Sequence, residues 1–490
     1  MLRQGKWHVL SRARGSLGGG MVVSAAGVVA AVTVAALVTG TAPAAMASSA
    51  TAVASPKYWV APTSTSTANN SCATAAYTTV QSAVTAAELY ESSHTKAVPT
   101  IELCPGTYSE QVTITRSLVL TRAKVAARRG PVVIQLPASV GADQSTGLSA
   151  TNCQADDTAS QLPQSVIEIC AATTGGINTK GVSVTISHVT VQGNWPTTVC
   201  NDSLYGILVE GGGRLSLADS IVEQIGAYPL NGCQGGVGVE AGFAPTHQVG
   251  HLAMNGDTVQ TYQKNGITAD GPGSTATISG VTVTGAGPTS AIAQNGIQIS
   301  LGATASVVGS TITGNNYTGN GEASSAGILV FGGGGTVCGI GKNSPLVKKA
   351  SFTHNSLINN DVGVALFNVN SGCDKSVRTP TRDVVCHNSI SNYHGYAGGV
   401  PSADANVSGL ITPKYGAIGD QAGVSDSGDR DVICDNSIRG QGYAPRGKTR
   451  ALPNPRPPAW VRPVDLFSFA AAFRPHVYGN KYDGKAYTPR

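Results

Sequence analysis

Residues 206–210 read Gly-Ile-Leu-Val-Glu, and this glycine-led apolar stretch returns at a nearly fixed interval along the middle of the chain. Clear copies begin at Gly206, Gly236, Gly266, Gly296 and Gly327, in steps of 30, 30, 30 and 31 residues. Self-similarity at this spacing indicates a solenoid, in which each unit buries its apolar side against its neighbours. Apolar residues alternate with period two inside each copy, which predicts that the units are β-strands.

A second repeated stretch runs in register with the first and is apolar at its first and last positions. Its copies are 217–222, 254–259, 278–283, 307–312, 352–357, 385–390 and 433–438. Each unit therefore holds at least two strands, and the variable distance between copies must leave the coil as loops. This pattern predicts an all-β chain wound as a parallel β-helix. Asn355, Asn388 and Asn436 share one position in successive copies, so we expect a hydrogen-bonded asparagine stack.

The first 47 residues have the pattern of a signal peptide. A basic start is followed by the apolar run 21–38 and by Ala45-Met46-Ala47, which fits a cleavage site. The alternative is an uncleaved membrane anchor. The formal charge of +5 comes mainly from the four basic residues of this leader, because without them 28 positive residues face 27 negative ones. We therefore expect an extracellular protein that is free of the membrane after cleavage, is monomeric and does not bind nucleic acid.

Ten cysteines in an exported chain are expected to form disulfides. Stacked strands lie about 4.8 Å apart, within the range that a disulfide accepts. Equivalent places in successive coils, or proximity in the chain, predict the pairs Cys72–Cys104, Cys153–Cys170, Cys200–Cys233, Cys338–Cys373 and Cys386–Cys434. The competing interpretation is a metal cluster, but no C-x-x-C or histidine spacing supports one.

The two ends of the chain are predicted to close the solenoid. Residues 77–87 form an amphipathic pattern that predicts a short capping helix, followed by strands at 100–104 and 108–115. The expected layout is a signal peptide (1–47), a linker (48–56), an N-terminal cap with the first coils (57–130), the β-helix repeats (131–440), a proline-rich connector (441–465) and a C-terminal coil or cap (466–490).

Gly106-Thr107-Tyr108-Ser109-Glu110 matches a G-x-Y-x-E element, and it follows the predicted capping helix. Together with the coil repeat, this part of the chain resembles the pectin methylesterases and the wider pectate lyase-like superfamily over about residues 57–440. The resemblance implies a right-handed parallel β-helix of single strands and a polysaccharide or cell-surface glycan as partner. The catalytic strings of pectin methylesterases, resembling Q-D-T-L, D-F-I-F-G and L-G-R-P-W, are absent.

If Ile207 and Val209 point inward, the fourth outward position stacks Glu210, Glu240 and Asp270 on consecutive coils. Three uses are open for such a column. The carboxylates are oxygen ligands of the kind that Ca²⁺ takes. Two of them at this spacing suit the acid and the nucleophile of a glycosidase. In the third interpretation the carboxylates have no functional role and are solvated on an open face.

Other residues were considered for the same face of the β-helix. Lys264 and Arg214 are the nearest candidates for a base that abstracts a proton beside a uronate carboxylate. The aromatic candidates for stacking on sugar rings are Tyr205, Tyr262, Phe331 and Phe367, and ordinary packing under the loops is the alternative. The sequence thus predicts a secreted protein that binds and degrades an acidic polysaccharide as a lyase or hydrolase. The alternative is a non-catalytic exported protein that binds glycans, adheres or serves as a scaffold.

Overall fold

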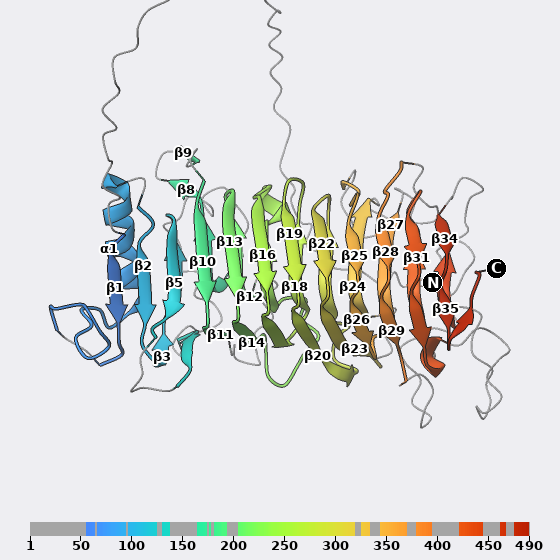
Figure 1. Ribbon diagram of the computed structural model, residues 1–490, viewed down its shortest axis with the longest axis horizontal. Helices are drawn as coiled ribbons and strands as arrows, with labels where there is room; N and C mark the ends of the chain where they lie inside the picture. The colour runs from blue at the N-terminus through green and yellow to red at the C-terminus, as the bar shows by residue number, and fades with distance from the viewer. Residues whose placement is uncertain are drawn as a thin grey trace, which may run out of the picture.

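The computed structural model describes residues 55–63, 66–94, 97–124, 130–137, 164–173, 176–177, 181–193, 204–318, 325–333, 344–369, 379–393, 421–443, 461–466 and 475–489. Its strands lie in three long parallel sheets, named A, B and C, around one apolar interior (Figure 1). Each regular coil contributes one strand to sheet A, then one to B and one to C, with the right-handed crossover usual for parallel strands. The predicted right-handed parallel β-helix is confirmed.

The strands of each sheet follow one another in chain order, with three strands in a coil where the sequence indicated at least two. Sheet A contains β1 Lys57–Val60, β2 Thr100–Leu103, β5 Leu118–Arg122, β10 Ser183–Ser187, β13 Gly213–Ala218, β16 Gly250–Asn255, β19 Thr275–Ser279, β22 Thr304–Val308, β25 Ser351–Thr353, β28 Val384–Cys386, β31 Val432–Cys434 and β34 His476–Tyr478. Sheet B contains β3 Gly106–Ser109, β6 Val132–Gln135, β11 Thr190–Gln192, β14 Ile221–Ile225, β17 Thr258–Tyr262, β20 Thr282–Thr289, β23 Thr311–Tyr317, β26 Ser356–Ile358, β29 Ser389–Ser391, β32 Ser437–Arg439, β35 Lys481–Tyr482 and β36 Lys485–Ala486. Sheet C contains β4 Val112–Ile114, β7 Gln164–Cys170, β12 Leu204–Glu210, β15 Val237–Ala241, β18 Asn265–Asp270, β21 Asn295–Ser300, β24 Ala326–Gly333, β27 Val362–Val369, β30 Gln421–Asp426 and β33 Val461–Leu466. Outside these sheets are the helix α1 Val80–Ser93, the 3₁₀ turns η1 Ala244–Thr246 and η3 Gln441–Tyr443, and the small pair β8 Ala172–Thr173 and β9 Gly176–Ile177.

The register of sheets A and B agrees with the second repeated stretch of the sequence. Leu217, Met254 and Ile278 are direct partners on neighbouring strands of sheet A, and the column continues to β31. Val222 and Val259 begin the matching column of sheet B. All of these side chains are buried in one continuous apolar core.

The register of sheet C corrects one glycine of the first repeated stretch. A Cβ atom on Gly206 would lie 2.5 Å from the carbonyl oxygen of Gly238, and one on Gly238 would lie 2.4 Å from that of Gly266. These three glycines therefore lie over one another, and the close approach of the backbones leaves no room for a side chain. Gly236, the predicted member of the column, stands two residues earlier with a left-handed φ of 91°. The predicted stacking of Gly206, Gly236 and Gly266 is wrong at its second member.

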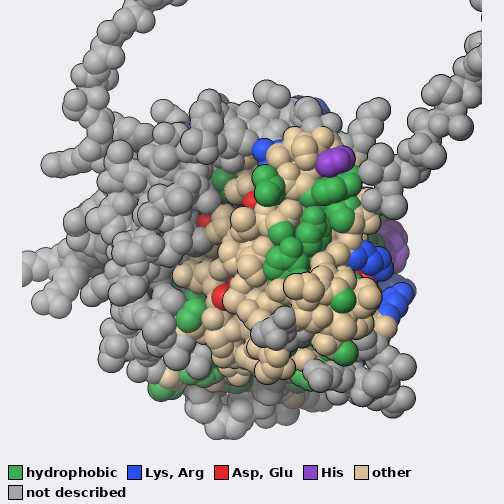
Figure 2. Space-filling view, turned by 90° about the vertical axis from the view of Figure 1, so that its left-hand side faces the viewer, with side chains coloured by type: hydrophobic (Ala, Val, Ile, Leu, Met, Phe, Trp, Pro, Cys, Tyr) green, Lys and Arg blue, Asp and Glu red, His purple; other side chains and the backbone are tan. Residues whose placement is uncertain are grey.

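Helix α1 covers the N-terminal end of the core, as the amphipathic pattern predicted. Its buried residues are those on the predicted face: Val80, Ala83, Val84 and Ala87. The Glu110 carboxylate of the G-x-Y-x-E element accepts the backbone N–H groups of Val80 and Gln81 at 2.7 and 2.8 Å, and so caps the helix. Figure 2 views this end and shows apolar side chains gathered near its middle. Leu89, in the last turns of α1, is 73% exposed.

The C-terminal coil closes the opposite end. Strand β33 is the edge strand of sheet C and begins within the range 441–465 that the sequence indicated as a connector. Pro463 is tolerated there because an edge strand has one side without a ladder partner. Strands β34 and β35 then add the last parallel strands of sheets A and B, and β36 turns back antiparallel to β35 at the edge of sheet B.

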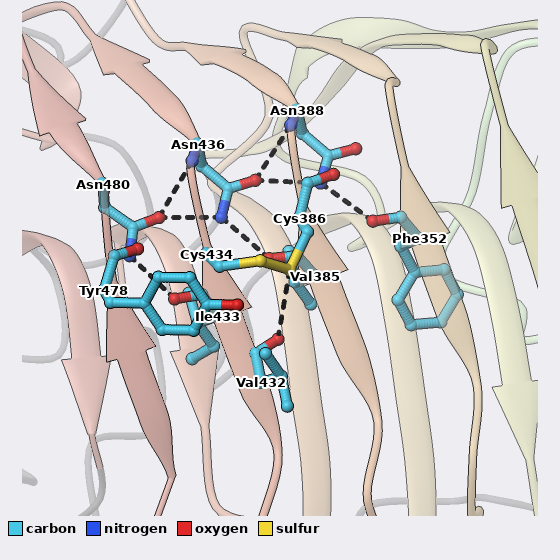
Figure 3. The surroundings of a disulfide bond; sticks show 10 residues. All are labelled: Phe352, Val385, Cys386, Asn388, Val432, Ile433, Cys434, Asn436, Tyr478 and Asn480. Atoms are coloured by element: carbon cyan, nitrogen blue, oxygen red, sulfur yellow. Dashed lines mark hydrogen bonds between the residues drawn. A yellow bond between two sulfur atoms is a disulfide. The ribbon is translucent and has the colours of Figure 1, made fainter.

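The predicted asparagine stack is present at the bend between sheets A and B and extends to Asn480 (Figure 3). The Oδ1 atom of Asn436 accepts the backbone N–H of Asn388 at 3.0 Å and its side-chain amide at 2.9 Å. The same contacts recur between Asn355 and Asn388. These side chains satisfy backbone groups that the bend leaves without sheet partners.

Two of the predicted disulfides are confirmed, namely Cys72–Cys104 and Cys386–Cys434, with Cα–Cα distances of 5.6 and 4.5 Å. Cys170 and Cys233 are also disulfide-bonded. Their predicted partners, and the pair Cys338–Cys373, lie outside the described residues, as does the predicted signal peptide. Within the described ranges, no helix has the length and apolar character needed to cross a membrane.

Candidate functional site

The outer face of sheet C carries a group of carboxylates. Glu168, Glu210, Glu240 and Asp270 alternate with core residues of their strands and therefore point away from the interior. Their exposed fractions are 0, 1, 6 and 9%. The interpretation in which these side chains stand in open solvent does not agree with this burial.

The predicted column of Glu210, Glu240 and Asp270 is divided between two rows. Glu240 lies directly between Leu208 and Thr268. Glu210 and Asp270 belong to the neighbouring row, two positions further along their strands. The cause is the glycine register described above, because a shift of two residues keeps a side chain on the same face but moves it to another row.

Asp270 and Glu240 have different electrostatic surroundings. The two oxygens of Asp270 accept the Ser300 hydroxyl at 2.7 Å and the backbone N–H of Ala244 at 3.0 Å. Burial raises the pKa of Asp270, and these hydrogen bonds oppose the rise. The pKa of Glu240 is raised well above its usual range by burial, and then by the charges of Asp270 and Glu210. Glu240 therefore keeps its proton to a higher pH than an ordinary carboxyl group does, whereas both oxygens of Asp270 already have hydrogen-bond donors.

A loop and an apolar cluster cover this part of the face. The loop between β15 and β16 contains η1, whose Ala244 bonds Asp270, and Phe243, which packs against Tyr205 and Leu208. The rings of Tyr205 and Phe243 meet edge to face with centroids 6.4 Å apart. Tyr205 is only 2% exposed, so its ring has no free surface for a sugar.

Tyr262, another predicted sugar-binding residue, lies inside the β-helix. It is fully buried in the main core, and its hydroxyl donates a hydrogen bond to Oδ1 of Asn315. Its ring therefore cannot contact a ligand on the outer face. Tyr262 stands four places before the strand glycine Gly266, and its side chain points inward, a direction that the sequence pattern left undetermined.

Phe331 and Phe367 do lie together on the outer face of sheet C. They are direct partners on β24 and β27, and their rings are stacked at 6.0 Å with an interplanar angle of 6°. Leu329 packs beside them and, like Phe367, is partly exposed. Their row continues through Ser300 to Asp270. We call Leu329, Phe331 and Phe367 the aromatic strip.

The two basic candidates differ in their placement. Arg214 is on β13 of sheet A, where it pairs with Ser183 and His251, so it belongs to a different face of the coil. The ammonium group of Lys264 donates to the carbonyl oxygen of Ala293 at 2.8 Å. Burial lowers the pKa of Lys264 to about 8. Arg214 is thus unsuited to act with Glu240, and Lys264 is engaged by backbone.

A Ca²⁺ site at the predicted column finds little support in these contacts. Asp270 is occupied by Ser300 and Ala244, as described. Glu168 and Glu210 do approach each other, with ligand atoms within 4.8 Å, but the third member of that group is Cys170, which is disulfide-bonded. The sequence pattern did not indicate Glu168, because Val166 stands where the later strands of sheet C have glycine. Strand β7 therefore shows no repeat signature.

No protein-family model matches the sequence, and none of the curated proteins matches it. Among solved structures, the Dettilon tailspike protein (gp208) is 12% identical over 83% of this chain and 68% of that chain, with a TM-score of 0.40. XylC in complex with xylose is 10% identical over 79 and 69% of the two chains, with a TM-score of 0.41. Pectate lyase Pel9A is 14% identical over 89 and 82%, with a TM-score of 0.40. The strand pairing of this chain itself establishes its fold.

Proposed function

We propose that this protein is a carbohydrate-binding β-helix that holds a glycan chain against the outer face of sheet C. The observation that carries the proposal is the aromatic strip, in which Phe367 is partly exposed on a rigid strand. Sugar rings present flat C–H faces that stack on aromatic rings, and polar groups beside the ring fix its orientation. Gln298, on the strand next to the strip, is partly exposed and supplies such a group.

The charge of this face favours a neutral glycan over the acidic polymer expected from the sequence. The described outer face of sheet C carries Glu168, Glu210, Glu240 and Asp270. A polyuronate approaching the strip would meet like charge from the carboxylates of this face that are ionised. A neutral chain avoids this repulsion.

Binding without cleavage agrees best with the carboxylate geometry. A general base or nucleophile needs an oxygen directed at the substrate, and both oxygens of Asp270 bond to Ser300 and Ala244 instead. The disulfides Cys72–Cys104 and Cys386–Cys434 support an oxidising, extracellular location for this activity.

The proposal is tested by affinity electrophoresis and calorimetry with neutral glycans and polyuronates. Phe367→Ala should weaken binding to a neutral glycan about tenfold, since a stacked aromatic contact contributes roughly 1–1.5 kcal/mol. The matched control is Tyr478→Ala, which removes a 56% exposed aromatic side chain from sheet A. The control should bind as the unmodified protein does.

Equal affinity of the Phe367→Ala variant and the unmodified protein would remove the aromatic strip from the proposal. Preference for polyuronates would contradict the electrostatic argument. The same incubations are followed for new reducing ends and for the absorbance of unsaturated products. Either signal, if abolished by Glu240→Gln, would replace the binding function by a catalytic one.

A further inference from the structure

Three aspartates point into the interior of the β-helix near its C-terminal end. Asp383, Asp426 and Asp431 each have an exposed fraction of 0%. Asp426 is the last residue of β30, and Asp431 directly precedes β31, so the short turn between sheets C and A brings them together. Asp383 lies one coil earlier, at the position that stacks on Asp431.

The position of Asp426 is apolar in every earlier coil. Its row in sheet C, read toward the N-terminus, consists of Leu366, Val330, Ile299, Ala269, Ala241, Val209, Ile169 and Ile114. The strand after it places Leu466 in the same row. An aspartate in such a column loses its hydration without gaining apolar contact, which is costly unless something compensates the charge.

The hydrogen bonds of the cluster leave two oxygens unsatisfied. Oδ1 of Asp426 accepts the backbone N–H of Gly428 at 2.8 Å, and Oδ1 of Asp431 accepts the Thr381 hydroxyl at 2.6 Å and the backbone N–H of Asp383 at 2.7 Å. The Oδ2 atoms of Asp426 and Asp431 are buried and have no hydrogen-bond donor. Each of these two carboxyl groups lies within hydrogen-bonding range of the other, an arrangement that two ionised carboxylates cannot use.

Among the residues that the structure describes, no basic side chain forms an ion pair with these aspartates. The ion pairs of the described residues involve other carboxylates, and none includes Asp383, Asp426 or Asp431. The cluster therefore requires a positive partner from outside the described chain, either a bound cation or a proton.

We propose that Asp426 and Asp431, the two residues of the cluster with unsatisfied buried oxygens, form a buried structural site for an oxygen-ligating divalent cation, Ca²⁺. All atoms of the cluster that can ligate a metal ion are oxygens, so the site lacks the nitrogen and sulfur ligands that Zn²⁺ prefers. Asp383 is held by hydrogen bonds of its own, from the backbone N–H of Ala350 to one oxygen and from the side-chain amide of Asn368 to the other. Ca²⁺ accepts flexible coordination by carboxylates, whereas Mg²⁺ gives up its water shell reluctantly.

The site is distinct from the glycan-binding face of the proposed function. Its residues face the interior at the corner between sheets C and A, while the aromatic strip lies outside sheet C. Occupation of the site would fasten the turn 427–431 and two successive coils. The expected consequence is stability of the C-terminal coils, with no change in the affinity for glycan.

The test uses the purified full chain, dialysed against a chelator or against CaCl₂. We expect one Ca²⁺ per chain by native mass spectrometry and a Tm that falls on treatment with EGTA, because a ligand that binds only the folded state stabilises it. Asp426→Asn and Asp431→Asn should abolish both the bound Ca²⁺ and the response to EGTA. The matched control is Asp219→Asn, at a bend residue whose side chain is 62% exposed, and it should keep both.

A second variant separates loss of the site from loss of the fold. Asp426→Leu restores the apolar column and should fold with or without Ca²⁺, with a Tm that EGTA does not change. The proposal is overturned if the unmodified protein holds no Ca²⁺ and its Tm is the same in EGTA and CaCl₂. In that case Asp426 and Asp431 share a proton. Retention of the Ca²⁺ response by Asp426→Leu would equally overturn it, because the cation would then bind elsewhere.

Discussion

Removal of the Asn436 side chain should loosen the C-terminal coils of the β-helix. Asn436 is 1% exposed, and its carboxamide bridges three coils (Figure 3). Its Oδ1 accepts from Asn388, and its Nδ2 donates to the carbonyl oxygen of Val385 and to Oδ1 of Asn480, both at 2.8 Å. An alanine keeps the backbone of the bend and deletes all of these bonds.

The magnitude follows from the groups that lose their partner. Asn436→Ala leaves the backbone N–H of Asn388 and the carbonyl of Val385 buried without their side-chain partner. Asn480 still accepts the backbone N–H of residue 436 at 3.0 Å, so it is affected less. At roughly 1–3 kcal/mol for each unsatisfied buried group, we expect a loss of about 3–4 kcal/mol in local unfolding free energy.

Native-state hydrogen exchange measures this loss strand by strand. Amides of β28, β31 and β34 should exchange faster in Asn436→Ala, while those of β13 and β16, several coils away, should be unchanged, because a solenoid transmits stability mainly between neighbours. Ser389→Ala, an exposed position next to the stack, is the control and should exchange normally. If the β31 amides were equally protected against exchange in Asn436→Ala and Ser389→Ala, the asparagine stack would contribute nothing to local stability. That result would refute the prediction.

Two further perturbations follow from the same bend. Replacing the Cys386–Cys434 disulfide by serines should cost about 4 kcal/mol on the chain-entropy account for a separation of 48 residues, measured by denaturant unfolding without reductant. Asp257 bonds the backbone N–H groups of Ser220 and Asn255, and burial raises its pKa to about 6. A raised carboxyl pKa favours the folded state when protonated, so this stability is present below about pH 4 and is lost as the pH rises through 6, by roughly 2–3 kcal/mol in total. Asp257→Asn should flatten that part of the pH–stability curve, and an unchanged slope would contradict the assignment.

The bend between sheets A and B could be predicted from the sequence because its two strands keep a fixed separation. Leu217 and Val222 are five residues apart, as are their partners in every later coil, so both columns follow from counting. No loop is inserted between these two strands in the described coils. The stacked asparagines therefore stand at the same position in each successive copy. The predicted disulfide Cys386–Cys434 follows from the same fixed register and is confirmed.

Sheet C could not be aligned by counting, because loops of unequal length precede its strands. Gly236-Val237 and Gly238-Val239 offer two equivalent glycine–apolar starts, and the interval of 30 residues favoured the first. Only the close contact of Gly238 with Gly266 decides for the second. The division of the carboxylate column follows from this choice. The pairing of Phe331 with Phe367 does not depend on this choice, since their strands have single glycine starts, Gly327 and Gly363, which lie over each other.

The polar residues that point into this β-helix are of two kinds, those whose side chain can donate a hydrogen bond and those whose side chain can only accept one. Asn388 and Asn436 each offer a donor and an acceptor, so successive members satisfy one another and the bend requires no outside group. Asp426 and Asp431 offer only acceptors when ionised, and two of those acceptors meet in the interior without a donor. An asparagine at either position would complete the pattern used one bend away. The chain has aspartate instead, and the electrostatic cost of that substitution in the core is the physical reason for expecting a cation there.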